Sequence, residues 1–196
     1  MTDPVESRGR PGGGDPRARR ILLLLAAITV APVLASYTIY YFFPRSTQVN
    51  YGTLLPTAPA PEIRGERADG TPWRLADQRG RWVLLVAGDG RCDAACQRKL
   101  YATRQARTMQ GREQDRIVRV WLVTGPTPPD PAVLGEQPGL VTVRVADAAP
   151  AVLPGGPGAI YLVDPLGNLV LQYSDDPDIK GVSKDLARVL KASGIG

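Results

Sequence analysis

The sequence predicts an α/β fold with a mixed sheet flanked by helices, carried behind one N-terminal membrane-spanning helix. Three observations predict it: an uncharged apolar segment at residues 21–43, strand-like runs that alternate with helix-like segments after residue 63, and a closing hairpin followed by a helix. Alternating strands and helices favour parallel pairing, and the closing hairpin adds antiparallel strands. A chain of 196 residues suffices for one such domain with appendages, but is too short for two full domains.

The composition excludes several function classes. The sequence contains no histidine, which excludes Ser-His-Asp and Cys-His catalytic pairs and every histidine-ligated metal site. Its 24 Lys and Arg against 19 Asp and Glu give a net charge of +5. These basic residues form no stripe interleaved with aromatic residues, so we expect no nucleic-acid partner.

Residues 1–20 are rich in Gly, Pro and Arg and are predicted to be a disordered cytoplasmic tail. Residues 21–43 are predicted to form a transmembrane helix, because a helix of that length spans roughly 34 Å, against about 30 Å for a hydrocarbon core. Pro32 should kink this helix, which membrane helices tolerate. Aromatic side chains gather at its C-terminal end, as expected for a membrane interface: Tyr37, Tyr40, Tyr41, Phe42 and Phe43.

The orientation follows from the arginines that precede the apolar segment. Five precede it and only Arg45 follows closely, which places the N-terminus in the cytoplasm and the domain on the periplasmic side of the inner membrane. A mitochondrial intermembrane-space location is the equivalent alternative. A second alternative is a cleaved signal peptide, with a small-residue site at residues 33–35. The domain is exported whether the apolar segment is a permanent anchor or a cleaved signal peptide.

Residues 44–62 are predicted to be a Pro-rich linker, since Pro56, Pro59 and Pro61 favour extended polyproline geometry. The domain is then expected at residues 63–196, with a long Pro- and Gly-rich loop at 125–139. The expected helices are 93–111 and 179–193, and three aspartates near the second, Asp175, Asp176 and Asp178, are expected to charge its N-terminus rather than bind a cation. The expected strands are 63–66 and 73–75 (a hairpin), 81–87, 117–123, 140–145, 159–163 and 169–173.

The two cysteines, Cys92 and Cys96, form a C-x-x-x-C motif between the strand 81–87 and the following helix. Residues i and i+4 of a helix lie on one face with Cα atoms about 6 Å apart, which permits a disulfide. A thiol at a helix N-terminus favours the thiolate, and two thiolates could hold Cu(I). The alternative is a structural disulfide, although so small a loop gains little stability from chain entropy.

The runs GRWVLLVAGDGRCDAACQRKL and IYLVDPLGNLVLQY resemble the Sco/SenC family of thioredoxin-like cytochrome c oxidase assembly proteins. The resemblance implies a thioredoxin-like fold behind a membrane anchor. It implies thiol–disulfide exchange or two-thiolate Cu(I) handling by Cys92 and Cys96, with a cytochrome c oxidase subunit or another assembly factor as partner. In an exchange reaction Cys92, nearer the helix terminus, would attack and Cys96 would resolve.

The sequence departs from the family at the third copper ligand. That histidine would fall near Gly156, but the sequence contains no histidine. Of the family's copper ligands, only the two cysteines therefore have counterparts in this chain. Thioredoxin folds place a cis-proline before the strand that faces the cysteines, and Pro157 has that position; a trans loop proline is the alternative. Two further functions stay open, namely a general exported thiol–disulfide oxidoreductase and a non-catalytic interaction module with a structural disulfide.

Overall fold

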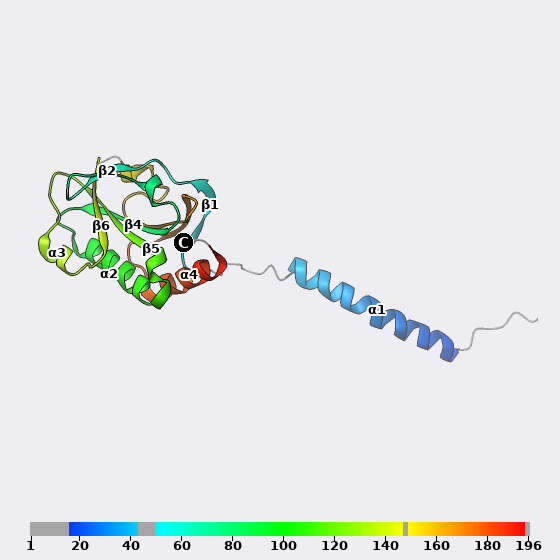
Figure 1. Ribbon diagram of the computed structural model, residues 1–196. Helices are drawn as coiled ribbons and strands as arrows, with labels where there is room; N and C mark the ends of the chain where they lie inside the picture. Colours follow the sequence, from blue (N-terminus) through cyan, green and yellow to red (C-terminus); the bar gives the residue numbers. More distant parts are fainter. Residues whose placement is uncertain (1–15, 43–49, 147–148, 195–196) are drawn as a thin grey trace, which may run out of the picture. The chain divides into compact units, whose positions relative to one another are not determined.

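The computed structural model describes residues 16–42, 50–146 and 149–194, as one N-terminal helix and one separate domain (Figure 1). Helix α1 (Pro16–Phe42) is long and apolar enough from Pro16 to Ile39 to cross a membrane. It begins five residues inside the predicted disordered tail, which is a correction for residues 16–20. Proline is tolerated in the first turn of a helix and arginine is a good helix former, so the helix extends back to Pro16. Residues 1–15 lie outside the described part.

The predicted linker is also corrected, because strand β1 (Thr53–Pro59) lies within it. This strand pairs antiparallel with β8 (Asn168–Tyr173) and forms one edge of the sheet. A proline at a sheet edge need not supply a ladder hydrogen bond, so Pro56 and Pro59 are compatible with a strand. Most β1 side chains are exposed, which explains why no apolar alternation marked the strand in the sequence. Residues 43–49 lie outside the described part.

Within the described residues one eight-stranded sheet has the order β1-β8-β7-β4-β5-β6-β2-β3. Strands β4, β5 and β6 are parallel neighbours, and every other pairing is antiparallel. The predicted α/β fold with a mixed sheet is therefore confirmed. The remaining strands are β2 (Arg64–Arg67), β3 (Pro72–Arg74), β4 (Trp82–Asp89), β5 (Ile117–Thr124), β6 (Leu140–Val145) and β7 (Ile160–Val163).

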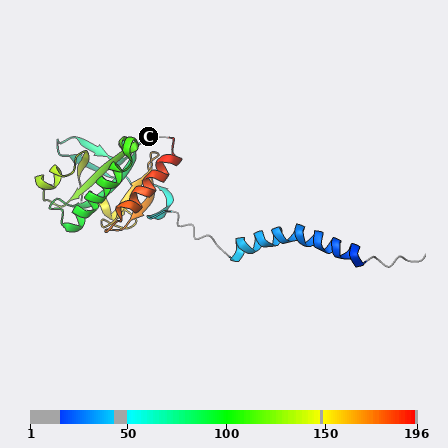
Figure 2. The ribbon, with the colours of Figure 1, turned by 90° about the horizontal axis from the view of Figure 1, so that it is seen from below.

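Helices α2 (Ala94–Thr108) and α4 (Ile179–Ala192) lie side by side on one face of the sheet (Figure 2). Alternate residues of β4 and β5, among them Leu84 and Trp121, pack with both helices into one core cluster. The opposite face of the same strands forms a second cluster with the β2–β3 hairpin. Buried on both faces, β4 and β5 are the continuous apolar runs that the sequence displays.

The predicted loop at 125–139 contains a short helix, α3 (Pro131–Gly135), which corrects the expectation. Asp130 caps it by accepting a 2.9 Å hydrogen bond from the Ala132 N–H, and Pro131 occupies the first turn. Three short 3₁₀ helices complete the described structure: η1 (Leu75–Gln78), η2 (Gly111–Arg116) and η3 (Ala149–Val152).

Candidate functional site: the disulfide pocket

Cys92 and Cys96 form a disulfide where β4 leads into α2, with their Cα atoms 5.0 Å apart. The expectation that both lie on one helical face is wrong, because only Cys96 belongs to the helix. The Asp93 carboxylate caps α2 by accepting a 2.9 Å hydrogen bond from the Cys96 N–H, so the helix begins at Ala94. Cys92 therefore precedes the cap, and its φ of 47° lies in the left-handed region.

The loop that carries Cys92 is held at both ends. The Cys92 N–H donates to the Asp89 carbonyl (3.0 Å), and the Gln97 side-chain amide donates to the Cys92 carbonyl (2.9 Å). The Asp89 carboxylate accepts the Arg91 N–H (2.9 Å), and this hydrogen bond lowers the pKa of Asp89. Gly90 passes so close to Thr127 that a Cβ would lie 2.1 Å from its carbonyl oxygen. Residue 90 must therefore be glycine, because any side chain there would collide with the backbone of Thr127.

Both cysteines are buried, with Cys92 1% and Cys96 4% exposed. The Cys96 sulfur lies against the interior of the sheet, since a Cβ on Gly88 would be 3.3 Å from that sulfur and 3.6 Å from Trp121 Nε1. Trp121 is fully buried, and its indole N–H has no hydrogen-bond partner among the described residues. The Cys96 sulfur and this indole N–H therefore both border the space that a Cβ on Gly88 would fill.

Lys99 is the functional candidate that the sequence reasoning missed. It is only 5% exposed, and its Nζ donates to the carbonyl oxygens of Gly158 (3.0 Å), Ala87 (3.4 Å) and Pro157 (3.5 Å). An ammonium has three N–H donors, which matches three acceptors. Burial lowers the pKa of Lys99, while Asp93 and Asp175 act in the opposite direction. The missed signal was helical spacing, because Lys99 lies three residues after Cys96 on the buried face of α2.

The segment before β7 holds Pro157 and Gly156. The described residues contain no cis peptide bond, so Pro157 is the trans loop proline and not the cis-proline of a thioredoxin fold. A trans X-Pro bond is the ordinary state, and here the Pro157 carbonyl accepts from Lys99. Gly156 stands at the position expected for a histidine, and its carbonyl oxygen accepts a 2.8 Å hydrogen bond from the Tyr161 hydroxyl.

The end of β4, the cysteine loop, the start of α2 and the segment before β7 border one pocket of about 690 Å³, which we call the disulfide pocket. It is lined by both cysteines and also by Lys99, Pro157 and Asp175. Of the three predicted aspartates, Asp178 caps α4 through a 2.8 Å hydrogen bond from the Gly181 N–H, as expected. Asp175 instead reaches the disulfide pocket, a placement that sequence spacing did not indicate.

The residues of the disulfide pocket do not fit a copper site. Cu(I) prefers thiolate, thioether and imidazole ligands. The only two thiols are bonded to each other, and the sequence has no histidine. Among residues 16–42, 50–146 and 149–194, no group of three His, Cys, Asp or Glu side chains could hold a metal ion. The pocket instead contains a buried ammonium.

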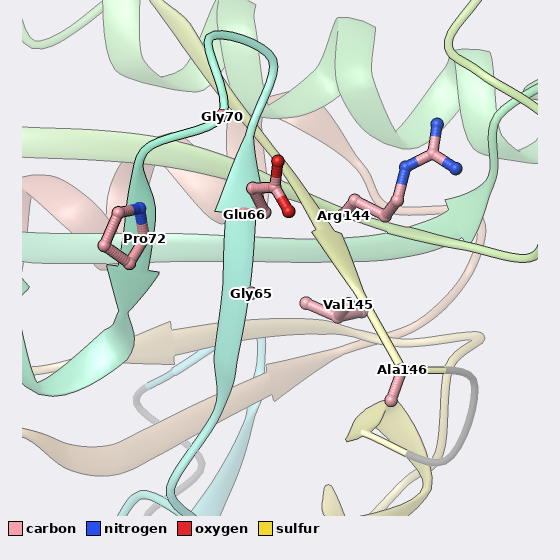
Figure 3. A pocket seen from close by; sticks show the side chains of 7 residues that line it. All are labelled: Gly65, Glu66, Gly70, Pro72, Arg144, Val145 and Ala146. Atoms are coloured by element: carbon pink, nitrogen blue, oxygen red, sulfur yellow. The ribbon is translucent and has the colours of Figure 1, made fainter.

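A second hollow of about 450 Å³ lies between β2 and β6 and shares no lining residue with the disulfide pocket (Figure 3). Glu66 and Arg144 are directly opposite each other on these two strands. The Arg144 guanidinium extends away from the hollow and donates to the Pro126 carbonyl (3.5 Å). With neither a thiol nor a buried titratable group in its lining, this hollow offers no chemistry comparable to that of the disulfide pocket.

The sheet, its two covering helices and the disulfide before α2 define a thioredoxin-like protein. Residues 82–193, more than half of the chain, match the model of one family. The chain belongs to that family, the transmembrane-like, thioredoxin-like C-terminal domain. A comparison with curated protein sequences finds no significant match.

Solved Sco1/SenC proteins are among the structural neighbours. Apo Sco1 from Thermus thermophilus is 24% identical, with a TM-score of 0.58 over 75% of this chain and 98% of that one. Yeast Sco1 with copper bound is 18% identical, with a TM-score of 0.56 over 70% and 91%. The thioredoxin domain of a Bacteroides vulgatus thiol-disulfide oxidoreductase is 22% identical, with a TM-score of 0.51 over 69% and 99%. At these identities the likeness establishes the thioredoxin-like fold.

Proposed function

We propose that this chain is a membrane-anchored thiol–disulfide exchange factor that acts through Cys92 and Cys96. The observation that carries the proposal is a disulfide placed at the N-terminus of α2 and lining an open pocket. A helix N-terminus favours a thiolate, which is both the attacking and the leaving species in exchange. The thiol-disulfide oxidoreductase among the structural neighbours supports the same chemistry.

Exchange begins when the Cys92 thiolate attacks one sulfur of a client disulfide, forming a mixed disulfide and releasing one client thiolate. Cys96 then attacks the Cys92 sulfur, releases the second client thiolate and leaves the Cys92–Cys96 disulfide. Two electrons pass to the client, and a dithiol reductant returns them to the cysteine pair. Cys92 suits the attacking role because it lies on a loop, whereas the Cys96 sulfur packs beside Gly88 and Trp121. Because Cys92 is buried, the 90–92 loop must shift for the attack.

We propose that the client is a cysteine pair of cytochrome c oxidase or of another assembly factor, on the periplasmic side of the inner membrane. The resemblance to Sco/SenC proteins and the apolar helix α1 support this placement. Under this proposal α1 is the anchor and the N-terminus is cytoplasmic. A general exported oxidoreductase would use the same residues on other clients. Two-thiolate Cu(I) handling is the weaker candidate, because the pocket lacks a third soft ligand.

The test is the reduction potential of the full-length protein in detergent micelles, with the thiol–disulfide ratio measured by alkylation. We expect a potential above about −300 mV, and a value well below that would identify a structural disulfide and overturn the proposal. The client is identified by trapping. Cys96→Ser should accumulate a mixed disulfide through Cys92 in native membranes, whereas Cys92→Ser/Cys96→Ser should trap nothing. Trapping of an oxidase subunit or assembly factor supports the specific client, and trapping of unrelated proteins supports the general oxidoreductase.

A further inference from the structure

The positive charge of Lys99 is buried in the disulfide pocket without a carboxylate in contact. Its ammonium contacts three carbonyl oxygens, and none of the ion pairs formed by the described residues includes Lys99. Asp93 and Asp175 line the same pocket and act on Lys99 through their charge, but neither forms an ion pair with it among the ion pairs of the described residues. Lys99 follows Cys96 by one helical turn on the buried face of α2. The pocket therefore has a fixed cation beside the disulfide.

Reduction of the disulfide creates a negative charge in the same pocket as this cation. Two electrons from a dithiol break the Cys92–Cys96 bond; one sulfur takes a proton and the other remains a thiolate. A buried thiolate is costly unless a neighbouring cation or hydrogen-bond donor stabilises it. Lys99 lines the same pocket as both cysteines and supplies a buried positive charge, and the Trp121 N–H has no hydrogen-bond partner among the described residues.

We propose that the Lys99 ammonium is the built-in counter-ion of the reduced cysteine pair. The inference rests on the proposed function and deepens it, because it makes Lys99 the positioning residue that stabilises the thiolate formed when the pair is reduced. The attraction between the ammonium and a thiolate lining the same pocket favours the reduced pair over the disulfide, and the thiolate over the thiol.

The first experiment compares thiol–disulfide equilibrium constants of full-length variants against dithiothreitol. Lys99→Gln keeps side-chain donors for the carbonyls but removes the charge. We expect its equilibrium to shift about tenfold toward the disulfide, equivalent to about 30 mV. Lys99→Arg keeps the charge and should remain near the wild type. Lys184→Gln is the matched control, because Lys184 is exposed on α4. Equal constants for the wild type and Lys99→Gln would overturn the counter-ion role.

The second experiment measures the ionisation of the thiols in the reduced proteins, from the pH dependence of their alkylation by iodoacetamide. We expect the midpoint of that dependence to lie at higher pH in Lys99→Gln than in the wild type, a change that a purely structural role would not produce. Equal midpoints would overturn the counter-ion role. Circular dichroism checks folding, and Lys99→Met replaces Lys99→Gln in the redox measurement if the latter does not fold.

The two proposals fail in different ways. If the wild-type disulfide does not equilibrate with dithiothreitol or glutathione, the proposed exchange function fails. The alkylation comparison still tests Lys99 after chemical reduction with a phosphine. If the wild type exchanges but the charge of Lys99 changes neither the equilibrium constant nor the alkylation midpoint, only the inference about Lys99 fails.

Discussion

The buried carboxylate of Asp185 accepts a 2.8 Å hydrogen bond from the backbone N–H of Gly52, although 133 residues separate them. The same carboxylate accepts the Tyr51 N–H (3.0 Å) and pairs with Arg188 (3.1 Å). The Tyr51 hydroxyl accepts a 2.8 Å hydrogen bond from the Asp178 N–H. These contacts fasten the start of the domain to α4, beside the edge where β1 joins the sheet.

Asp185→Ala should lower the free energy of unfolding by about 3 kcal/mol, because it leaves the buried Gly52 N–H and the part-buried Tyr51 N–H without their acceptor. Urea denaturation followed by circular dichroism measures the loss. Arg188→Ala is the control: it removes a partly exposed ion pair and keeps both backbone bonds, so it should cost less than about 1 kcal/mol. Equal losses in the two variants would contradict the anchoring role of Asp185.

Gly90→Ala should destabilise the loop that carries Cys92. Its Cβ would lie 2.1 Å from the Thr127 carbonyl oxygen, so one of the two loops must move. We expect a loss of about 2 kcal/mol in the free energy of unfolding and faster reduction of the disulfide by dithiothreitol. Gly135→Ala is the matched control, because a Cβ there meets nothing within 4 Å. A Gly90→Ala protein with wild-type stability and reduction rate would show that this close approach does not hold the loop.

Trp121 should report the redox state of the cysteine pair. Its indole faces the Cys96 sulfur across Gly88, and a neighbouring disulfide quenches indole fluorescence. Reduction should therefore raise the intrinsic emission, and Trp121→Phe should abolish most of that rise. Trp82→Phe is the control, since Trp82 is also buried with no partner for its N–H among the described residues but is not one of the side chains nearest Gly88. Persistence of the full rise in Trp121→Phe would refute the assignment.

The Arg119 guanidinium is 2% exposed, and it donates a hydrogen bond to the Gln137 side chain. Burial lowers its pKa to about 10, with the charges of Arg104 and Arg107 adding to the effect. A buried charge without a carboxylate partner costs stability. Arg119→Met/Gln137→Leu should thus be at least as stable as the wild type, by up to about 2 kcal/mol. Arg119→Met alone should gain less, because it orphans the Gln137 oxygen. A double variant clearly less stable in urea would contradict this.

Lys99 also predicts a pH dependence of stability. Burial lowers its pKa below the ordinary 10.5, so between the lowered pKa and 10.5 the unfolded chain binds more protons than the folded one. The free energy of unfolding contributed by this group therefore rises with pH in that window. The stability of the wild type relative to Lys99→Gln should therefore increase as the pH rises from the lowered pKa toward 10.5, measured by urea denaturation. A constant difference would show that Lys99 titrates alike in both states.

Strands β4 and β5 and helix α4 could be predicted closely, because the two strands are continuous apolar runs and the apolar residues of α4 repeat with the helical period. Helix α3 could have been predicted from Asp130 and Pro131, which carry an N-cap and first-turn signal inside a Pro-rich stretch. Strand β1 could not, since an edge strand with exposed side chains has no apolar alternation. The cysteine pair was found from its spacing, but its exact backbone geometry was not.

By itself the sequence determined the apolar segment, the order of strands and helices, the cysteine pair and the absence of histidine. These features depend on local periodicity and residue identity, which the chain displays directly. Only the tertiary structure decided that Cys92 precedes the helix, that Lys99 is buried against Gly158 and that Asp185 holds Gly52. Each of these depends on packing between residues that are distant in sequence or on competition for one helix cap. No local pattern encodes which partner a buried charge will find.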